Sequence, residues 1–352
     1  MAIGDETGVI RILDAAANRA AEALRVIEDY VRFQLDDAHL TQLGKDLRHD
    51  LTAALAPLTI DIRLAARDTS HDVGTEITTA AEMQRESVEN VVAAAFSRLS
   101  QSLRSLEEYS KTVEGAIAAE IEPIRYRSYT LQRAVGTTTD SIERLAAINL
   151  MVLIDGRGST DAAVSLVDEL LSTGVRAFQL RDKSLEDAEL LQLAEAIRSP
   201  VQENGGLLII NDRPDIAVLA RADGVHLGQT DMSVKDARSI VGPRRLIGVS
   251  THNIEQAKQA VLDGASYMGV GPTFPSTTKS FDTFPGIEFV RAVSQQIKLP
   301  AFVIGGVTPM NLADVVAAGG RRVAVAGAIA NADLTELPQV TDRMLRALQA
   351  TD

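Results

Sequence analysis

The sequence predicts an α/β protein in which an all-α helical domain precedes a (β/α)8 TIM barrel. After about residue 140, eight short apolar runs alternate with amphipathic helical segments. Such alternation predicts a parallel sheet, and eight evenly spaced units favour a closed barrel over a doubly wound open sheet, which is the alternative. Before about residue 135, apolar residues instead recur at helical spacing and no strand-like alternating run stands out.

Length and composition are consistent with two domains. The chain has 352 residues, more than one ordinary domain needs. Hydrophobic residues make up 45% of the sequence and can fill a sizeable core, but aromatic residues make up only 4% and Trp is absent. Ala, Leu, Val and Ile must therefore fill that core, and a core rich in Ala suits close packing of helices.

The charge and the residue types exclude several classes of partner. The formal net charge of −13 disfavours nucleic-acid binding, although a local basic pocket can still hold a small anion. The absence of cysteine excludes disulfides and thiolate metal sites. No secretion signal opens the sequence, and no apolar run approaches the ~20 residues that span a bilayer. We expect a cytoplasmic protein without a membrane or nucleic-acid partner.

The helical domain, expected over residues 1–136, contains an internal repeat. Residues 19–30 match residues 98–109, and the charged positions of the match are Arg19 with Arg98, Arg25 with Arg104 and Glu28 with Glu107. We expect two related helices that face each other. Two interpretations of the repeated charges stay open. They can lie on a solvated or ion-paired helix surface, where Arg25 and Asp29 are one turn apart, or they can form a working face that grips phosphate and Mg²⁺.

Two polar segments break the helical pattern. Arg67–Gly74 ends in glycine and is expected to be a loop, in which Asp68, His71 and Asp72 either bind a metal or phosphate or cap helices. Residues 136–140 are short and polar and form the expected linker, so that the barrel occupies residues 141–352.

The apolar runs of the second domain are the expected strands of the barrel. Each is four or five residues long, and most precede a plausible helix. The expected strands are Leu150–Ile154, Ala177–Leu180, Leu207–Ile210, Gly224–Leu227, Leu246–Val249, Tyr267–Val270, Ala301–Ile304 and Val323–Ala326.

Polar residues follow these strands at the end where barrel enzymes place their active sites. Gln179, Arg181 and Lys183 alternate along an extended segment and share a face, and two cations side by side indicate a phosphate or diphosphate ligand. Asp212 and Asp231 carry the hard oxygen ligands that suit Mg²⁺.

Glycines follow the last two strands, where barrels commonly bind phosphate. Gly305, Gly306 and Gly327 leave backbone N–H groups open to approach by an anion. Taken singly, such residues more often cap helices or form turns. The histidine within the fourth strand, His226, is assigned to a local hydrogen bond and not to the site. The polar residues together predict a magnesium-dependent enzyme with two phosphate-bearing ligands.

The motifs of the barrel resemble those of thiamine phosphate synthase. The resemblance covers residues 149–352 and rests on Gln-Leu-Arg-Asp-Lys, Asn-Asp-Arg, Gly-Val-His-Leu-Gly-Gln-Thr-Asp, Gly-Val-Ser-Thr-His-Asn and Gly-Pro-Thr-Phe-Pro-Ser-Thr-Thr-Lys. It implies condensation of 4-amino-2-methyl-5-(diphosphooxymethyl)pyrimidine with a thiazole phosphate, with release of pyrophosphate.

The resemblance also implies a role for each matching residue. The residues that would bind the pyrimidine diphosphate are Gln179, Leu180, Arg181, Asp182, Lys183, Asn211, Ser250 and Lys279. Arg181, Lys183 and Lys279 would assist departure of the diphosphate, and Asp212 and Asp231 would hold Mg²⁺. The thiazole phosphate would contact Ser276, Thr277, Thr278, Gly305, Gly306, Ala326 and Gly327. The family commonly has Ser where Gly327 stands, so we expect a weaker phosphate anchor there.

The helical half resembles a domain fused ahead of this synthase in some bacteria and assigned hydroxymethylpyrimidine phosphate kinase activity. The resemblance covers residues 10–135 and rests on Asn18-Arg19, Glu-Ala-Leu-Arg-Val-Ile-Glu-Asp, the Arg-Asp-Thr…Asp-Val-Gly loop and Arg125-Tyr-Arg. It implies ATP as co-substrate, although the half has no Gly-x-x-x-x-Gly-Lys-Ser/Thr loop. The candidate residues are Arg19, Arg25, Glu28, Asp68, Asp72, Arg98, Arg104 and Glu107. The alternative is a non-catalytic module through which the chain forms a homodimer.

Overall fold

The computed structural model describes residues 3–69, 85–275, 284–330 and 335–349. The chain divides into two compact units, Met1–Val135 and Gly136–Asp352. No helix among the described residues has the length and apolar character needed to cross a membrane.

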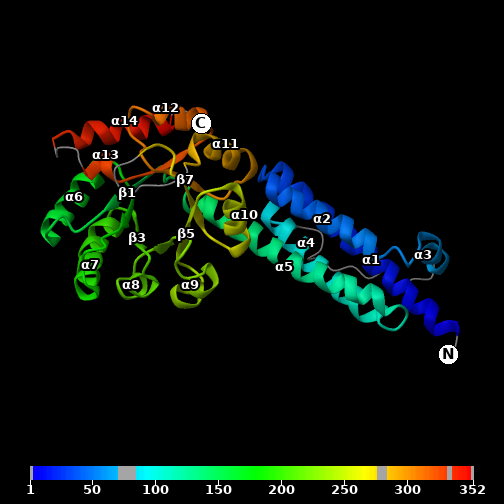
Figure 1. The fold of residues 1–352 in the computed structure, drawn as a ribbon. Coiled ribbons are helices and arrows are strands. Elements are labelled where there is room, and N and C mark those ends of the chain that lie inside the picture. Colours follow the sequence, from blue (N-terminus) through cyan, green and yellow to red (C-terminus); the bar gives the residue numbers. More distant parts are fainter. Residues whose placement is uncertain (1–2, 70–84, 276–283, 331–334, 350–352) are drawn as a thin grey trace. The chain divides into compact units, whose positions relative to one another are not determined.

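The first unit is helical, as expected. Its helices, coloured blue to green in Figure 1, are α1 (Ile3–Phe33), α2 (Ala38–Ala54), α3 (Ile60–Ala66), α4 (Val88–Ser110) and the first part of α5 (Gly115–Arg144). Asp37 and Ser87 cap the amino termini of α2 and α4, since each side chain accepts a hydrogen bond from a backbone N–H three residues later.

The two repeated segments lie on α1 and α4, which pack extensively against each other. Ala20 and Ala23 of α1 and Leu99 and Leu103 of α4 are fully buried. Alanine lets two helix backbones approach closely, so the scarcity of aromatic residues is compatible with a dense core. The prediction that the repeated helices face each other is confirmed.

The division between the two units falls at the start of the expected linker, residues 136–140. These residues continue helix α5, which ends at Arg144. The buried side chains Val135, Thr138, Ser141 and Leu145 recur at helical spacing, so this polar stretch has a buried face that a search for polar residues does not reveal.

The second unit contains a closed barrel of eight parallel strands in sequence order, and the predicted fold class is confirmed. The strands are β1 (Leu150–Ile154), β2 (Ala177–Leu180), β3 (Leu207–Asn211), β4 (Gly224–Leu227), β5 (Leu246–Thr251), β6 (Tyr267–Val270), β7 (Ala301–Ile304) and β8 (Arg322–Val325). β3 and β5 extend beyond the expected runs, and β8 is displaced by one residue toward the amino terminus.

Helices follow the strands and surround the barrel (Figure 1). They are α6 (Thr160–Ser172), α7 (Asp187–Glu203), α8 (Pro214–Leu219), α9 (Val234–Val241), α10 (Ile254–Asp263), α11 (Gly286–Gln296), α12 (Leu312–Ala317), α13 (Gly327–Ala330) and α14 (Leu337–Gln349).

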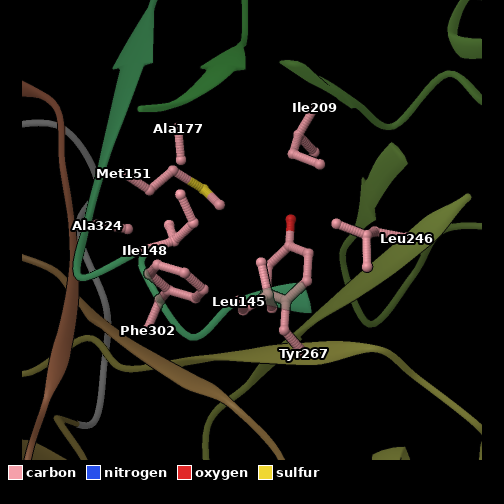
Figure 2. Close-up of a cluster of buried hydrophobic side chains, with 9 residues drawn as sticks. All are labelled: Leu145, Ile148, Met151, Ala177, Ile209, Leu246, Tyr267, Phe302 and Ala324. Carbon is pink, nitrogen blue, oxygen red and sulfur yellow. The ribbon is translucent and has the colours of Figure 1, made fainter. Parts of the chain in front are cut away.

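Apolar side chains fill the barrel near the start of its strands. The cluster in Figure 2 consists of Leu145, Ile148, Met151, Ala177, Ile209, Leu246, Tyr267, Phe302 and Ala324. Most of these residues are the first or second of their strand, while Leu145 and Ile148 precede β1. This packed layer fills the barrel at the end opposite to the carboxyl ends of its strands.

Candidate functional site

A pocket of about 660 Å³ opens at the carboxyl ends of the barrel strands. Its lining brings together many residues that sequence reasoning selected from distant parts of the chain. They are Gln179, Arg181, Lys183, Asn211, Asp212, Asp231, Ser250, Gly305, Gly306, Ala326 and Gly327. One pocket therefore contains cations, carboxylates and glycine-rich backbone.

The segment from β2 divides its residues between two environments. Gln179, Arg181 and Lys183 line the pocket, as the alternation of strand side chains requires. Leu180 is buried and does not belong to the lining. The carboxylate of Asp182 accepts hydrogen bonds from Gly156 N at 2.9 Å and from Ser184 N at 2.8 Å. Asp182 thus ties the loop after β1 to the loop after β2.

Asp212 and Asp231 form a carboxylate pair at one side of the pocket. Burial raises the pKa of Asp212, and a hydrogen bond shared with Asp231 raises it further. The charge of Asp231 also raises the pKa of Asp212. Lys183 offsets part of this increase, since its Nζ lies 3.7 Å from Asp212 Oδ2. The amide of Gly228 donates to Asp231 Oδ2 at 2.6 Å and orients that carboxylate.

This pair fits a divalent cation. Two adjacent carboxylates repel each other unless they share a proton or a cation, and hard oxygen donors are what Mg²⁺ prefers. No cluster of three or more His, Asp or Glu side chains suited to a metal occurs in the described part of the chain. Among the described residues, Asp212 and Asp231 are thus the carboxylates of the pocket that would hold such an ion.

Gly305 and Gly306 follow β7 in conformations that suit glycine. Their φ angles are +95° and +65°. A Cβ at Gly305 would lie 2.7 Å from Pro272 Cα, and one at Gly306 would lie 2.6 Å from Pro275 O. The backbone is thus left bare where it lines the pocket, and Ala326 and Gly327 line it after β8.

Four expected ligands cannot be placed. Ser276, Thr277, Thr278 and Lys279 lie outside the described residues.

His226 lines the pocket, although sequence reasoning left it out. Its Nε2 lies 2.9 Å from Ser250 Oγ and its Nδ1 lies 3.2 Å from Tyr267 Oη. The assignment to a local hydrogen bond was incomplete, because one partner is an expected ligand-binding residue. Strand alternation carried the signal, since His226 lies two residues before Gly228, which also lines the pocket.

In the helical unit, the repeated glutamates are buried and paired. Glu28 Oε2 accepts from Arg48 Nε at 3.0 Å, and Glu107 Oε2 accepts from Arg125 Nε at 2.6 Å. Each glutamate thus binds an arginine from the helix that follows its own. The hydrogen bond from Arg125 lowers the pKa of Glu107.

The repeated arginines are more accessible than the glutamates. The side chains of Arg25 and Arg104 are 56% exposed and lie 3.8 Å and 2.9 Å from Glu28 and Glu107, respectively. Arg19 is exposed and Arg98 is half-buried.

The loop candidates are only partly described. The backbone oxygen of Asp68 accepts from Arg11 at 3.0 Å, whereas Asp72 and His71 lie outside the described residues. Sequence reasoning missed the buried carboxylate of Asp14, which accepts two hydrogen bonds from Arg67, at 2.8 and 2.9 Å.

The chain matches two family models. One, described as thiamine monophosphate synthase, matches residues 150–329, and the other, the ThiD2 family, matches residues 11–134. The thiamine-phosphate synthase of Rhodopirellula baltica is 44% identical over 92% of this chain and 89% of its own. That of Gloeobacter violaceus is 40% identical over 95% of both chains.

A solved structure matches the barrel unit. Thiamine phosphate pyrophosphorylase from Pyrococcus furiosus is 29% identical, with a TM-score of 0.53, over 58% of this chain and 97% of that one. Because relatives at 40% identity or more extend over nearly the whole length, the helical unit is shared along with the barrel. This chain belongs to the thiamine-phosphate synthase family.

Proposed function

We propose that the barrel joins 4-amino-2-methyl-5-(diphosphooxymethyl)pyrimidine to a thiazole phosphate and releases pyrophosphate. One observation carries the proposal beyond the family match: a single pocket holds two cations and a carboxylate pair together with a bare glycine backbone. These features suit two anionic ligands, of which one is a diphosphate that needs a cation.

The diphosphate binds beside β2 and β3 in this proposal. Arg181 and Lys183 line the pocket there, and Lys183 reaches Asp212. Asn211 and Ser250 supply neutral polar groups, and Gln179 lies deeper in the barrel. Lys279 joins this set on the strength of its motif alone.

Asp212 and Asp231 would hold Mg²⁺, and a bound ion would supply positive charge beside the diphosphate leaving group. Lys183 contributes at the same place, because its ammonium lies close enough to Asp212 to contact a ligand bound to that carboxylate.

The thiazole phosphate binds at Gly305, Gly306 and the Ala326–Gly327 pair, with Ser276–Thr278 added by motif. Gly327 offers a backbone N–H but no hydroxyl. We therefore expect a weaker phosphate anchor than serine would give, without loss of the reaction.

The reaction needs no protein nucleophile. The bond between the pyrimidine methylene carbon and the diphosphate oxygen breaks, and its electron pair leaves with the diphosphate. The lone pair of the thiazole nitrogen then forms the new C–N bond to that carbon. Arg181 and Lys183 stabilise the charge that develops on the leaving group, and the phosphate anchor holds the thiazole close to the carbon.

The barrel unit alone should keep the synthase activity. Residues 136–352 contain every lining residue of the pocket and the complete closed barrel. We expect this fragment, assayed with preformed pyrimidine diphosphate and thiazole phosphate, to turn over within about threefold of the full chain. A fragment that is folded by circular dichroism yet inactive would contradict the assignment of the reaction to the barrel.

For the helical unit we propose phosphorylation of the pyrimidine monophosphate by ATP and Mg²⁺. The match to the ThiD2 family supports a kinase-like role, and the product would be the diphosphate that the barrel consumes. The second candidate is a non-catalytic module. The burial of Glu28 and Glu107 favours it, because both are engaged with arginines of neighbouring helices.

One assay separates the two candidates. Pure protein is given the pyrimidine monophosphate, ATP, Mg²⁺ and thiazole phosphate. Formation of thiamine phosphate would support both activities, whereas formation only from preformed diphosphate would leave the helical unit structural.

Alanine at Arg25 or Arg104 tests whether the repeated arginines bind substrate. Both side chains are more than half exposed, so their removal should lower the melting temperature by less than about 2 °C. In a kinase site, the same change should abolish phosphorylation of the pyrimidine monophosphate. Full phosphorylation by a folded variant would remove these arginines from the site.

A further inference from the structure

Below the pocket, four polar side chains are connected by hydrogen bonds across the barrel interior and form what we call the relay. Gln179 hydrogen-bonds to Tyr267, Tyr267 Oη lies 3.2 Å from His226 Nδ1, and His226 Nε2 lies 2.9 Å from Ser250 Oγ. These residues come from β2, β6, β4 and β5 in that order. The two ends of the relay, Gln179 and Ser250, line the pocket where the pyrimidine is proposed to bind.

The barrel interior provides space for the side chains of the relay. Figure 2 shows the Tyr267 hydroxyl pointing into the barrel interior among apolar side chains. A Cβ at Gly248 would lie 2.1 Å from Tyr267 Cζ, so the ring occupies the volume of a missing side chain. Tyr267 is 1% and Gln179 3% exposed, and their polar groups must therefore be satisfied inside the protein.

The order of hydrogen-bond donors along the relay follows from the residue types. Burial raises the pKa of Tyr267 and keeps it a neutral phenol, while a hydrogen bond from Gln179 opposes that rise. Gln179 Nε2 also donates to Met151 Sδ at 3.8 Å, so the amide nitrogen faces the barrel interior. Its N–H therefore donates to Tyr267 Oη, and the single phenol hydrogen is directed to His226 Nδ1.

A neutral imidazole that accepts at Nδ1 carries its hydrogen on Nε2. His226 Nε2–H then donates to Ser250 Oγ, and the Ser250 hydrogen is left to point into the pocket. At the other end, the Gln179 N–H group is engaged inward, so that its Oε1 is the group left to accept from a ligand.

We propose that Tyr267 and His226 are positioning residues that make Ser250 a donor and Gln179 an acceptor toward the pyrimidine. The inference rests on the proposed synthase function. A 4-aminopyrimidine has an amino donor beside a ring-nitrogen acceptor, which complements this arrangement. A 4-oxo pyrimidine has a carbonyl acceptor beside a ring N–H and presents the reverse pattern. The relay therefore selects the amino form of the substrate.

The test measures selectivity in the full chain without ATP. The 4-amino pyrimidine monophosphate and its 4-oxo counterpart serve as competitive inhibitors of thiamine phosphate formation, and the ratio of their Ki values is compared among variants. Mispaired buried groups cost enough that wild type should favour the amino form by about 100-fold. His226→Met and Tyr267→Phe, which remove one donor each, should lower that ratio about tenfold.

His226→Gln is the matched partner of His226→Met, because glutamine has a similar size and retains an N–H donor within reach of Ser250. It should keep the ratio within about threefold of wild type. The KM for thiazole phosphate should change less than twofold in each variant, since neither His226 nor Tyr267 is among the residues proposed to bind that phosphate.

Two results would overturn the proposal while leaving the proposed function intact. A folded His226→Met enzyme with the wild-type Ki ratio would show that the relay does not set selectivity. Equal loss of selectivity in the Gln and Met variants would show that size, not hydrogen-bond direction, matters at this position. A wild-type protein that forms no thiamine phosphate would overturn the proposed function together with this inference, and so is distinguishable from both.

Discussion

Asp231→Asn is expected to lower the rate of thiamine phosphate formation on the order of 10²-fold or more, and Asp212→Asn should behave alike. Neutralising one carboxylate weakens the hold on Mg²⁺ and so removes a few kcal/mol of charge stabilisation from the step in which the diphosphate leaves. Turnover should be measured at limiting Mg²⁺, where the variant falls furthest below wild type.

The same change should not weaken the fold. The pKa of Asp212 is raised by burial and by Asp231, so its ionisation opposes folding. Without metal, this pair therefore reduces the free energy of unfolding as the pH rises above the ordinary carboxyl pKa. At pH 7, Asp231→Asn should have a melting temperature equal to or above that of the metal-free wild type.

A matched control comes from the same barrel. Asp263 is an exposed carboxylate at the end of α10, outside the pocket, and it accepts a hydrogen bond from Gln259. Asp263→Asn should leave turnover near wild type. Near wild-type turnover of Asp231→Asn at limiting Mg²⁺ would remove the carboxylate pair from the proposed site.

The barrel could be predicted because its strands are buried on both sides and appear as short apolar runs. Five expected runs have the observed bounds, from Leu150–Ile154 to Ala301–Ile304. The boundaries differ where polar residues continue a strand, as Ser250 and Thr251 do in β5. Apolar content alone cannot reveal that extension, because hydrogen bonding to the neighbouring strands decides where a strand ends.

The pocket could be predicted only in outline. Strand order places Arg181, Asp212 and Gly305 at one end of the barrel, as the closed topology confirms. The relay through His226 requires knowing that Tyr267 of another strand points at the same space. That information depends on register and side-chain direction, which no single run of residues contains.

The functional residues of the helical unit were harder to predict, because charge alone does not distinguish a solvated surface from a binding site. The repeat indicated that Glu28 and Glu107 matter, but their partners Arg48 and Arg125 lie on other helices. The helical conformation of residues 136–140 was also not evident from the sequence, since Thr138 and the nearby Ser141 are polar yet fully buried.

Arg125→Ala is expected to destabilise the helical unit by about 3–5 kcal/mol, because it leaves Glu107 buried without its closest partner. Both side chains of this pair are less than 10% exposed, and Arg125 also lies over the ring of Tyr126. Thermal and urea unfolding of the full chain would measure the loss. Arg127→Ala is the control, since Arg127 pairs with Asp50 at the surface and should cost less than about 1 kcal/mol.

Acid pH should reduce the difference in the free energy of unfolding between wild type and Arg125→Ala. The pKa of Glu107 is lowered by its hydrogen bond with Arg125, so the stability from this pair is present above the unfolded pKa and is lost as the pH falls through the folded one. In the variant, burial without the arginine favours the protonated form of Glu107, and this form predominates at acid pH.

The double variant Glu107→Leu with Arg125→Met should recover much of the lost stability, because a buried pair can be replaced by apolar groups of similar volume. If Arg125→Ala melted like wild type at pH 7, Glu107 would not depend on this pair, and its burial would no longer favour a structural role for the repeat.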